Sequence, residues 1–153
     1  MKPSDTWRLA ERLLYNYTTN LTCRELLIID YNLIRAHGDI KAQAYTENYN
    51  KRRRDAVAEH YERLSSIHSK IRRLERKIMP VKRLIHKLNY PSSDDDKELY
   101  HDLQDVMLYI YFGHNTMRAT AIYLNKSISS LQRRKKRLVR MLIPEAEQMN
   151  EIC

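Results

Sequence analysis

The chain has 153 residues, a length that suits one or two small domains rather than a large multidomain enzyme. It contains only 2 glycines, where average usage gives roughly ten, and tight turns and strand bulges depend on glycine. Hydrophobic residues make up 42% of the chain, enough for a folded core, and the net charge of +9 favours a polyanionic partner. This composition predicts an all-α protein with long helices.

Residues 1–49 are expected to form a small helical N-terminal unit with balanced charge. Trp7, Leu13 and Leu14 lie at helical spacing in a first helix. Thr22 and Glu25 match a capping box, in which each side chain satisfies an amide at the start of a second helix. Gly38 is expected to end that helix. We find no functional motif in this unit.

Residues 50–88 are expected to form a long basic helix with a heptad pattern. This segment holds 13 Lys and Arg against 4 acids, and 9 of its 10 a and d positions are apolar. Such regularity over five heptads predicts a helix–helix interface. The residues expected to form it are Val57, Leu64, Ile67, Ile71, Leu74 and Ile78. A break is expected near Pro80, because proline removes a backbone hydrogen bond and clashes with the preceding turn.

Two arrangements could bury this heptad face. One is a parallel homodimer, favoured by the β-branched residues at several a positions, in which Lys70 could pair with Glu75 on the opposing helix. The other is packing within one chain. We expect the dimer and leave the second arrangement open.

Residues 89–93 are the predicted linker to a C-terminal domain. Pro91 disfavours helix in the residue before it, and Ser93 is a good N-cap for a helix that begins with Asp94–Asp96. Three carboxylates at a helix start are favoured by the helix dipole, so a metal site is the less simple interpretation. The domain is expected to span residues 94–143, with an acidic tail at residues 144–153.

The C-terminal domain has the pattern of a helix-turn-helix. A first helix with apolar residues between Leu99 and Ile110 is expected to end at Gly113. Thr116 is expected to cap a short helix, Met117–Leu124, and Asn125 to form the turn because it tolerates the left-handed conformation. Ser127 is expected to cap a third helix that runs to about Leu142. A short helix, a tight turn and a longer basic helix give this motif its layout.

The third helix has an apolar face and a cationic face. Leu131, Leu138 and Leu142 fall on one stripe that can pack on the first two helices. Residues 118–140 carry 8 Lys and Arg and no acid, which fits a helix in the major groove of DNA. The residues expected to face bases are Ser129, Gln132, Arg133 and Lys136. Those expected to face phosphates are Thr116, Lys126, Arg137 and Arg140.

The segment Thr116–Leu142 resembles the helix-turn-helix with which bacterial primary sigma factors read the upstream promoter element. The matching residues are Thr116, Ala121, Leu124, Ser127, Leu131 and Leu142, and residues 106–113 (VMLYIYFG) are similar to the preceding helix. Thr120, Lys126 and Arg134 stand where that motif is usually aliphatic, and Asn125 replaces a glycine. A long charged helix before such a domain also resembles bacteriophage late-transcription regulators of the RinA and ArpU type. The resemblance implies promoter binding and contact with RNA polymerase.

No motif for catalysis or for a cofactor is present. The six histidines never stand three or four residues apart, and neither cysteine has a ligand neighbour at zinc spacing. We therefore expect no enzyme, no metal and no cofactor. Without a signal-peptide pattern or an apolar run of the ~18 residues that span a bilayer, we expect a soluble cytoplasmic protein.

We expect a transcription regulator that binds double-stranded DNA. Two alternatives remain: a phage DNA-packaging recognition subunit, and a protein-interaction module that acts through the heptad helix.

Overall fold

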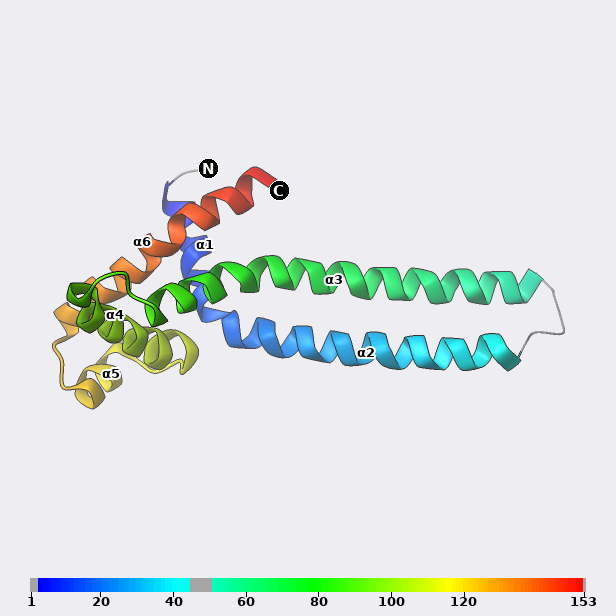
Figure 1. The fold of residues 1–153 in the computed structure, drawn as a ribbon, viewed down its shortest axis with the longest axis horizontal. Helices are drawn as coiled ribbons and strands as arrows, with labels where there is room; N and C mark the ends of the chain where they lie inside the picture. Colours follow the sequence, from blue (N-terminus) through cyan, green and yellow to red (C-terminus); the bar gives the residue numbers. More distant parts are fainter. Residues whose placement is uncertain (1–2, 45–50, 153) are drawn as a thin grey trace. The chain divides into compact units, whose positions relative to one another are not determined.

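The computed structural model describes residues 3–44 and 51–152, and every regular element within these ranges is a helix. The predicted all-α class is therefore confirmed. In chain order, the elements are α1 (Pro3–Tyr15), α2 (Tyr17–Ala44), α3 (Lys51–Asn89), α4 (Asp94–Val106), the π-helical segment η1 (Met107–Phe112), α5 (Met117–Leu124) and α6 (Ile128–Ile152) (Figure 1).

The chain divides into two compact units. One, which we call the hairpin unit, is Asn20–Glu75, and the other, which we call the terminal unit, combines Met1–Thr19 with Arg76–Cys153. This division differs from the separate N-terminal unit expected at residues 1–49, because α1 packs against α6 and η1. The contacts that bring α1 into the terminal unit join residues about a hundred positions apart, such as Tyr111 and Glu11.

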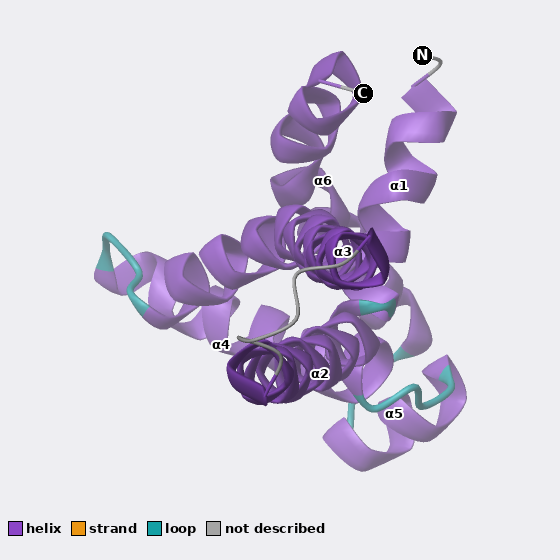
Figure 2. Ribbon diagram, turned by 90° about the vertical axis from the view of Figure 1, so that its right-hand side faces the viewer, coloured by secondary structure: helices purple, strands orange, loops and turns teal. Residues whose placement is uncertain are grey.

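In the hairpin unit, α2 and the first part of α3 lie side by side and run in opposite directions (Figures 1 and 2). The Arg24 Nε lies 3.2 Å from the Glu75 Oε1, and the rings of Tyr31 and His68 are 6.4 Å apart. The heptad residues that this packing leaves half-buried are Leu64, Ile67, Ile71 and Leu74. The heptad face therefore packs within one chain, and the partner of Glu75 is Arg24.

The hairpin unit has no fully buried side chain among residues 20–37 and 54–75. On α2, the side chains of Leu26, Ile29 and Leu33 are 57%, 53% and 63% exposed, and on α3 Val57 is 39% exposed. A pair of helices has no third layer to cover its outer faces. The closed core of the described chain therefore lies in the terminal unit.

The start and the end of α2 differ from the expected capping box and glycine stop. The helix begins at Tyr17, whose ring stacks on that of Phe112 at 5.0 Å and is almost completely buried. Thr22 is therefore an interior residue and not the N-cap. Gly38 also lies inside the helix and does not end it. A long helix can tolerate one glycine, because the cost is only about 1 kcal/mol relative to alanine.

Two prolines lie inside helices that were expected to break or end there. Pro80 stands within α3 and is buried between Ile78 and Val81, which are 1% and 0% exposed. Burial of this turn in the core offsets the lost backbone hydrogen bond, so the break expected near Pro80 was wrong. Pro144 lies within α6, and the helix continues to bury Ala146 completely. Residues 144–152 of the expected acidic tail are therefore the last part of α6.

The core of the terminal unit is centred on α6, which packs against α1, α4 and α5. Most of the expected core of the first C-terminal helix is confirmed, with Leu103, Val106 and Ile110 buried. The largest completely buried side chains of this unit include Leu14, Leu88, Leu103, Tyr111, Leu131, Leu138 and Leu142. These residues come from five elements, so the core is built from helices distant in the sequence.

The helix predicted before Gly113 changes its winding partway. After Val106 it continues as η1, and Gly113 N donates to Leu108 O at 2.8 Å, five residues back, as in a π-helix. A Cβ on Gly113 would lie 2.9 Å from Tyr109 O and 2.9 Å from Asn115 Nδ2. Glycine is therefore required here by close approach, and the expected end at Gly113 is confirmed.

Candidate nucleic-acid interface

Three predicted capping residues define α5, the turn and the start of α6. Thr116 Oγ1 accepts from Ala119 N at 3.1 Å, and Ser127 Oγ accepts from Ser130 N at 3.1 Å. Asn125 takes the left-handed conformation, with φ 54° and ψ 49°. Each of these caps satisfies an amide or closes a turn that the backbone leaves open. Both ends of α5 and the start of α6 were therefore predictable from the sequence.

The leucine stripe of α6 is buried, as predicted. Leu131 and Leu138 are 0% exposed and Leu142 is 1% exposed. Val139 and Ala146 are also completely buried. Because these residues occupy one side of α6, the opposite side is turned to solvent.

The predicted base-facing and phosphate-facing residues of α6 share that solvent-exposed side. They are Ser129, Gln132, Arg133, Lys136, Arg137 and Arg140, and all six are exposed. Among the side chains that the structure describes, Arg133, Lys136, Arg137 and Arg140 have no carboxylate partner within 4 Å. Unpaired cations at this density create a positive potential that attracts polyanions.

An open groove of about 640 Å³ follows this cationic side of α6. Its lining combines Leu99 of α4 with Ser130, Arg133, Arg134, Lys136, Arg137 and Arg140 of α6. Five of the seven lining residues are cationic. An extended ligand with many negative charges suits such an open groove better than a small apolar molecule.

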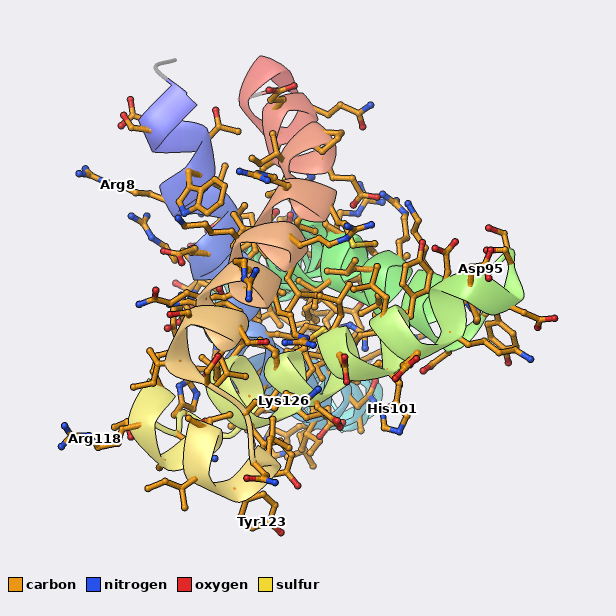
Figure 3. All side chains as sticks on the ribbon, turned by 90° about the vertical axis from the view of Figure 1, so that its left-hand side faces the viewer. Arg8, Asp95, His101, Arg118, Tyr123 and Lys126 are labelled. Atoms are coloured by element: carbon orange, nitrogen blue, oxygen red, sulfur yellow. The ribbon has the colours of Figure 1, made fainter. Side chains whose placement is uncertain are left out.

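Asp102 of α4 pairs with two cations from other elements. Its carboxylate oxygens lie 3.1 Å from Lys126 Nζ in the turn and 2.9 Å from Arg134 Nη2 in α6. Figure 3 shows Lys126 beside α4. Arg134 also donates to Ser130 Oγ. Partial burial would raise the pKa of Asp102, but the hydrogen bonds and positive charges of Lys126 and Arg134 outweigh it and lower the pKa.

The side chains of Lys126 and Arg134 both converge on the carboxylate of Asp102. Asp102 was not among the predicted site residues. The sequence feature that could have predicted its role is an acid in α4 combined with two cations, Lys126 and Arg134, at positions in the turn and α6. Lys126, predicted to face phosphate, has its ammonium group engaged inside the protein.

Lys135 is the other paired cation of α6. Its Nζ lies 3.7 Å from Glu11 Oε1 of α1, and 5.7 Å and 5.6 Å from the ring centres of Tyr15 and Tyr111. The hydroxyl of Tyr111 donates to the same Glu11 oxygen at 3.5 Å. Burial, followed by the nearby Glu11 charge, raises the pKa of Tyr111, which stays protonated. Lys135 therefore joins α6 to α1.

The outer face of α5 has a different character. Arg118 and Tyr123 point away from the rest of the terminal unit (Figure 3). Ile122 is 77% exposed, and the ring of Tyr123 lies 4.9 Å from that of Tyr109 on η1. This face is mainly apolar and aromatic and carries one cation, Arg118, whereas the exposed side of α6 carries four.

The described residues offer no alternative site of two common kinds. Among them, no group of three or more His, Cys, Asp or Glu residues is arranged to hold a metal ion. In the same part of the chain, no helix is both long and apolar enough to cross a membrane.

Comparison with protein-family models, with curated proteins and with solved structures gives no match to this chain. The geometry and charge of the terminal unit are therefore the basis on which a function can be proposed.

Proposed function

We propose that the protein is a sequence-specific, DNA-binding transcription regulator. In this proposal α5, the turn at Asn125 and α6 act as a helix-turn-helix, with α6 in the major groove of the duplex. The capped short helix, the left-handed turn residue and the anchored leucines of α6 support this assignment. The ligand is promoter or operator DNA.

The observation that carries the proposal is the separation of paired and unpaired cations on one helix. Arg134 and Lys135, on the flanks of α6, pair with Asp102 and Glu11. The cations on its exposed side have no such partner among the described residues. A helix that only needed solubility would gain nothing from concentrating unpaired like charges, which repel one another. Duplex DNA supplies the missing negative charge.

The exposed residues divide into two proposed roles. Ser129, Gln132, Arg133 and Lys136 are the base-reading set, because Arg and Gln can bind guanine and adenine edges through two hydrogen bonds. Arg137, Arg140 and Thr116 contact phosphates and fix the register of the helix. Lys126 is better assigned to the turn, since Asp102 already holds its ammonium group.

We further propose a biological setting and an oligomeric state for this regulator. The resemblance to phage late-transcription regulators favours a bacteriophage protein that acts in the host cytoplasm and contacts RNA polymerase. A homodimer would let two α6 helices read a pseudo-symmetric site.

Selection from a random duplex library at physiological salt, followed by affinity measurements, tests the function. We expect Arg133→Ala to weaken binding to the selected site by ~1–3 kcal/mol and to relax preference at one base pair. The matched variant Arg137→Ala should weaken binding to selected and random duplexes equally. Absence of duplex binding by the full chain at physiological salt would refute the proposal.

A further inference from the structure

The last part of α3 carries a second set of exposed cations in the terminal unit. Between residues 76 and 89 the sequence has no acid. The cations of this segment are Arg76, Lys77, Lys82, Arg83 and Lys87, and all five are exposed. We call this set the α3 cation row.

Three of the five members lie on one side of the helix, and Lys77 and Lys82 lie to either side of them. Arg76, Arg83 and Lys87 are spaced i, i+7 and i+11, which places them along one line about 16 Å long. Val81 and Leu84, on another side of the same turns, are buried in the core. Packing of the helix therefore decides which way Arg76, Arg83 and Lys87 face.

The row adjoins α6. Arg83 Nη1 lies 3.4 Å from Glu145 Oε2, and Glu145 follows Arg140 by five residues, or about 7.5 Å along the helix axis. The other members have no carboxylate within 4 Å in the described part of the chain. One ion pair thus connects the α3 cation row to α6, the helix that bears Arg133, Lys136, Arg137 and Arg140.

We propose that the α3 cation row is a second DNA-contacting surface, which binds phosphates next to the segment occupied by α6. This inference rests on the proposed function. Lysine and arginine side chains spread along a helix surface can bind phosphates, contacts that fix position without reading sequence. The row adds affinity without adding sequence preference.

The test uses the full chain with three cations of the row neutralised, Arg76→Gln, Lys82→Gln and Lys87→Gln. Arg83 is left intact because it pairs with Glu145. The matched control removes the same charge from exposed residues of the hairpin unit, with Arg35→Gln, Arg63→Gln and Lys70→Gln. Circular dichroism checks the helix content of both variants. Fluorescence anisotropy then measures affinity for a selected and a random duplex over a range of salt concentrations.

For the row variant, we expect the slope of log affinity against log salt to become shallower by roughly three, at ~0.9 per lost phosphate contact. The loss of affinity should be the same on the selected and the random duplex. An unchanged slope, or an equal loss in the control, would overturn the inference while leaving the role of α6 intact. If the wild-type chain binds no duplex, both proposals fail together.

Discussion

Asp102 is a partly buried carboxylate that joins the elements of the candidate interface through two ion pairs. It lies on α4, yet its partners come from the turn and from α6, so a single side chain connects three segments of the terminal unit. Its side chain is 20% exposed, and those of Lys126 and Arg134 are 30% and 21% exposed. At this burial, loss of the carboxylate leaves two cations poorly solvated. We therefore assign Asp102 a positioning role for α6.

We expect Asp102→Asn to lower the free energy of unfolding by roughly 1–3 kcal/mol at neutral pH, because charged hydrogen bonds to two cations are lost. The pKa of Asp102 is lower in the folded chain than the usual 3.8, so the unfolded chain binds more protons in acid. The stabilisation is thus present above about pH 4 and is lost as the pH falls through the lowered pKa. Urea unfolding across this range checks the prediction, with exposed Asp95→Asn as the control.

At Gly113, helix propensity predicts the wrong sign for the change in stability on substitution by alanine. Alanine usually stabilises a helix by about 1 kcal/mol relative to glycine. Here the new Cβ would lie 2.9 Å and 3.0 Å from the carbonyl oxygens of Tyr109 and Leu108, which are fixed in the backbone. We expect Gly113→Ala to destabilise the chain by ~1–3 kcal/mol, as overpacking does. Thermal unfolding measures it, and an unchanged or higher Tm would contradict the account.

At the scale of the element, α3 is one helix with two kinds of environment. Its first part, in the hairpin unit, faces α2 with half-buried residues. From Ile78 onward its apolar side enters the closed core of the terminal unit. The same heptad pattern runs through both parts, so the pattern alone does not distinguish a two-helix contact from a core. The change in burial along the helix also explains why Pro80 is tolerated.

We expect Ile71→Ala to lower the free energy of unfolding by ~1–2 kcal/mol, less than full burial would give because the residue is half-buried. The matched change Val57→Ala, at a position 39% exposed, should cost under ~0.5 kcal/mol. Because the heptad face packs on α2 of the same chain, the cost of Ile71→Ala should not depend on protein concentration. A Tm that rises with concentration in wild type but not in Ile71→Ala would favour a dimer through this face.

At the scale of the whole molecule, charge is distributed unevenly along a chain of net charge +9. Residues 89–117 hold 6 acids and 1 Lys, and residues 118–140 hold 8 Lys and Arg without an acid. The acids of α4 pair with only some of the cations of the turn and α6. The cationic excess therefore appears on the solvent side of α6, where a polyanion can reach it.

If six phosphates are neutralised on binding, we expect affinity for duplex DNA to fall about a thousandfold between 50 and 200 mM salt. Counterion release causes this loss, so it should appear with random as well as selected duplexes. Anisotropy titrations at four salt concentrations measure the slope. A flat response would contradict a binding mode dominated by α6 cations.

Much of the secondary structure of the C-terminal part could be predicted from the sequence alone, because it depends on interactions between neighbouring residues. The caps Thr116 and Ser127 and the left-handed Asn125 need only neighbouring backbone amides, and the leucine stripe of α6 needs only helical periodicity. These features depend on residues within one or two turns, which sequence patterns describe well. The all-α class follows in the same way from composition.

Which helices pack against one another could be learned only from the tertiary structure. The packing of α1 on α6, the pairing of Asp102 with Lys126 and Arg134, and the antiparallel packing of the heptad face on α2 all join residues distant in sequence. The uninterrupted course of α3 through Pro80 has the same origin, since burial of the neighbouring side chains offsets a local cost. Short-range propensities carry no information about these contacts, because their free energy comes from surfaces that the fold brings together.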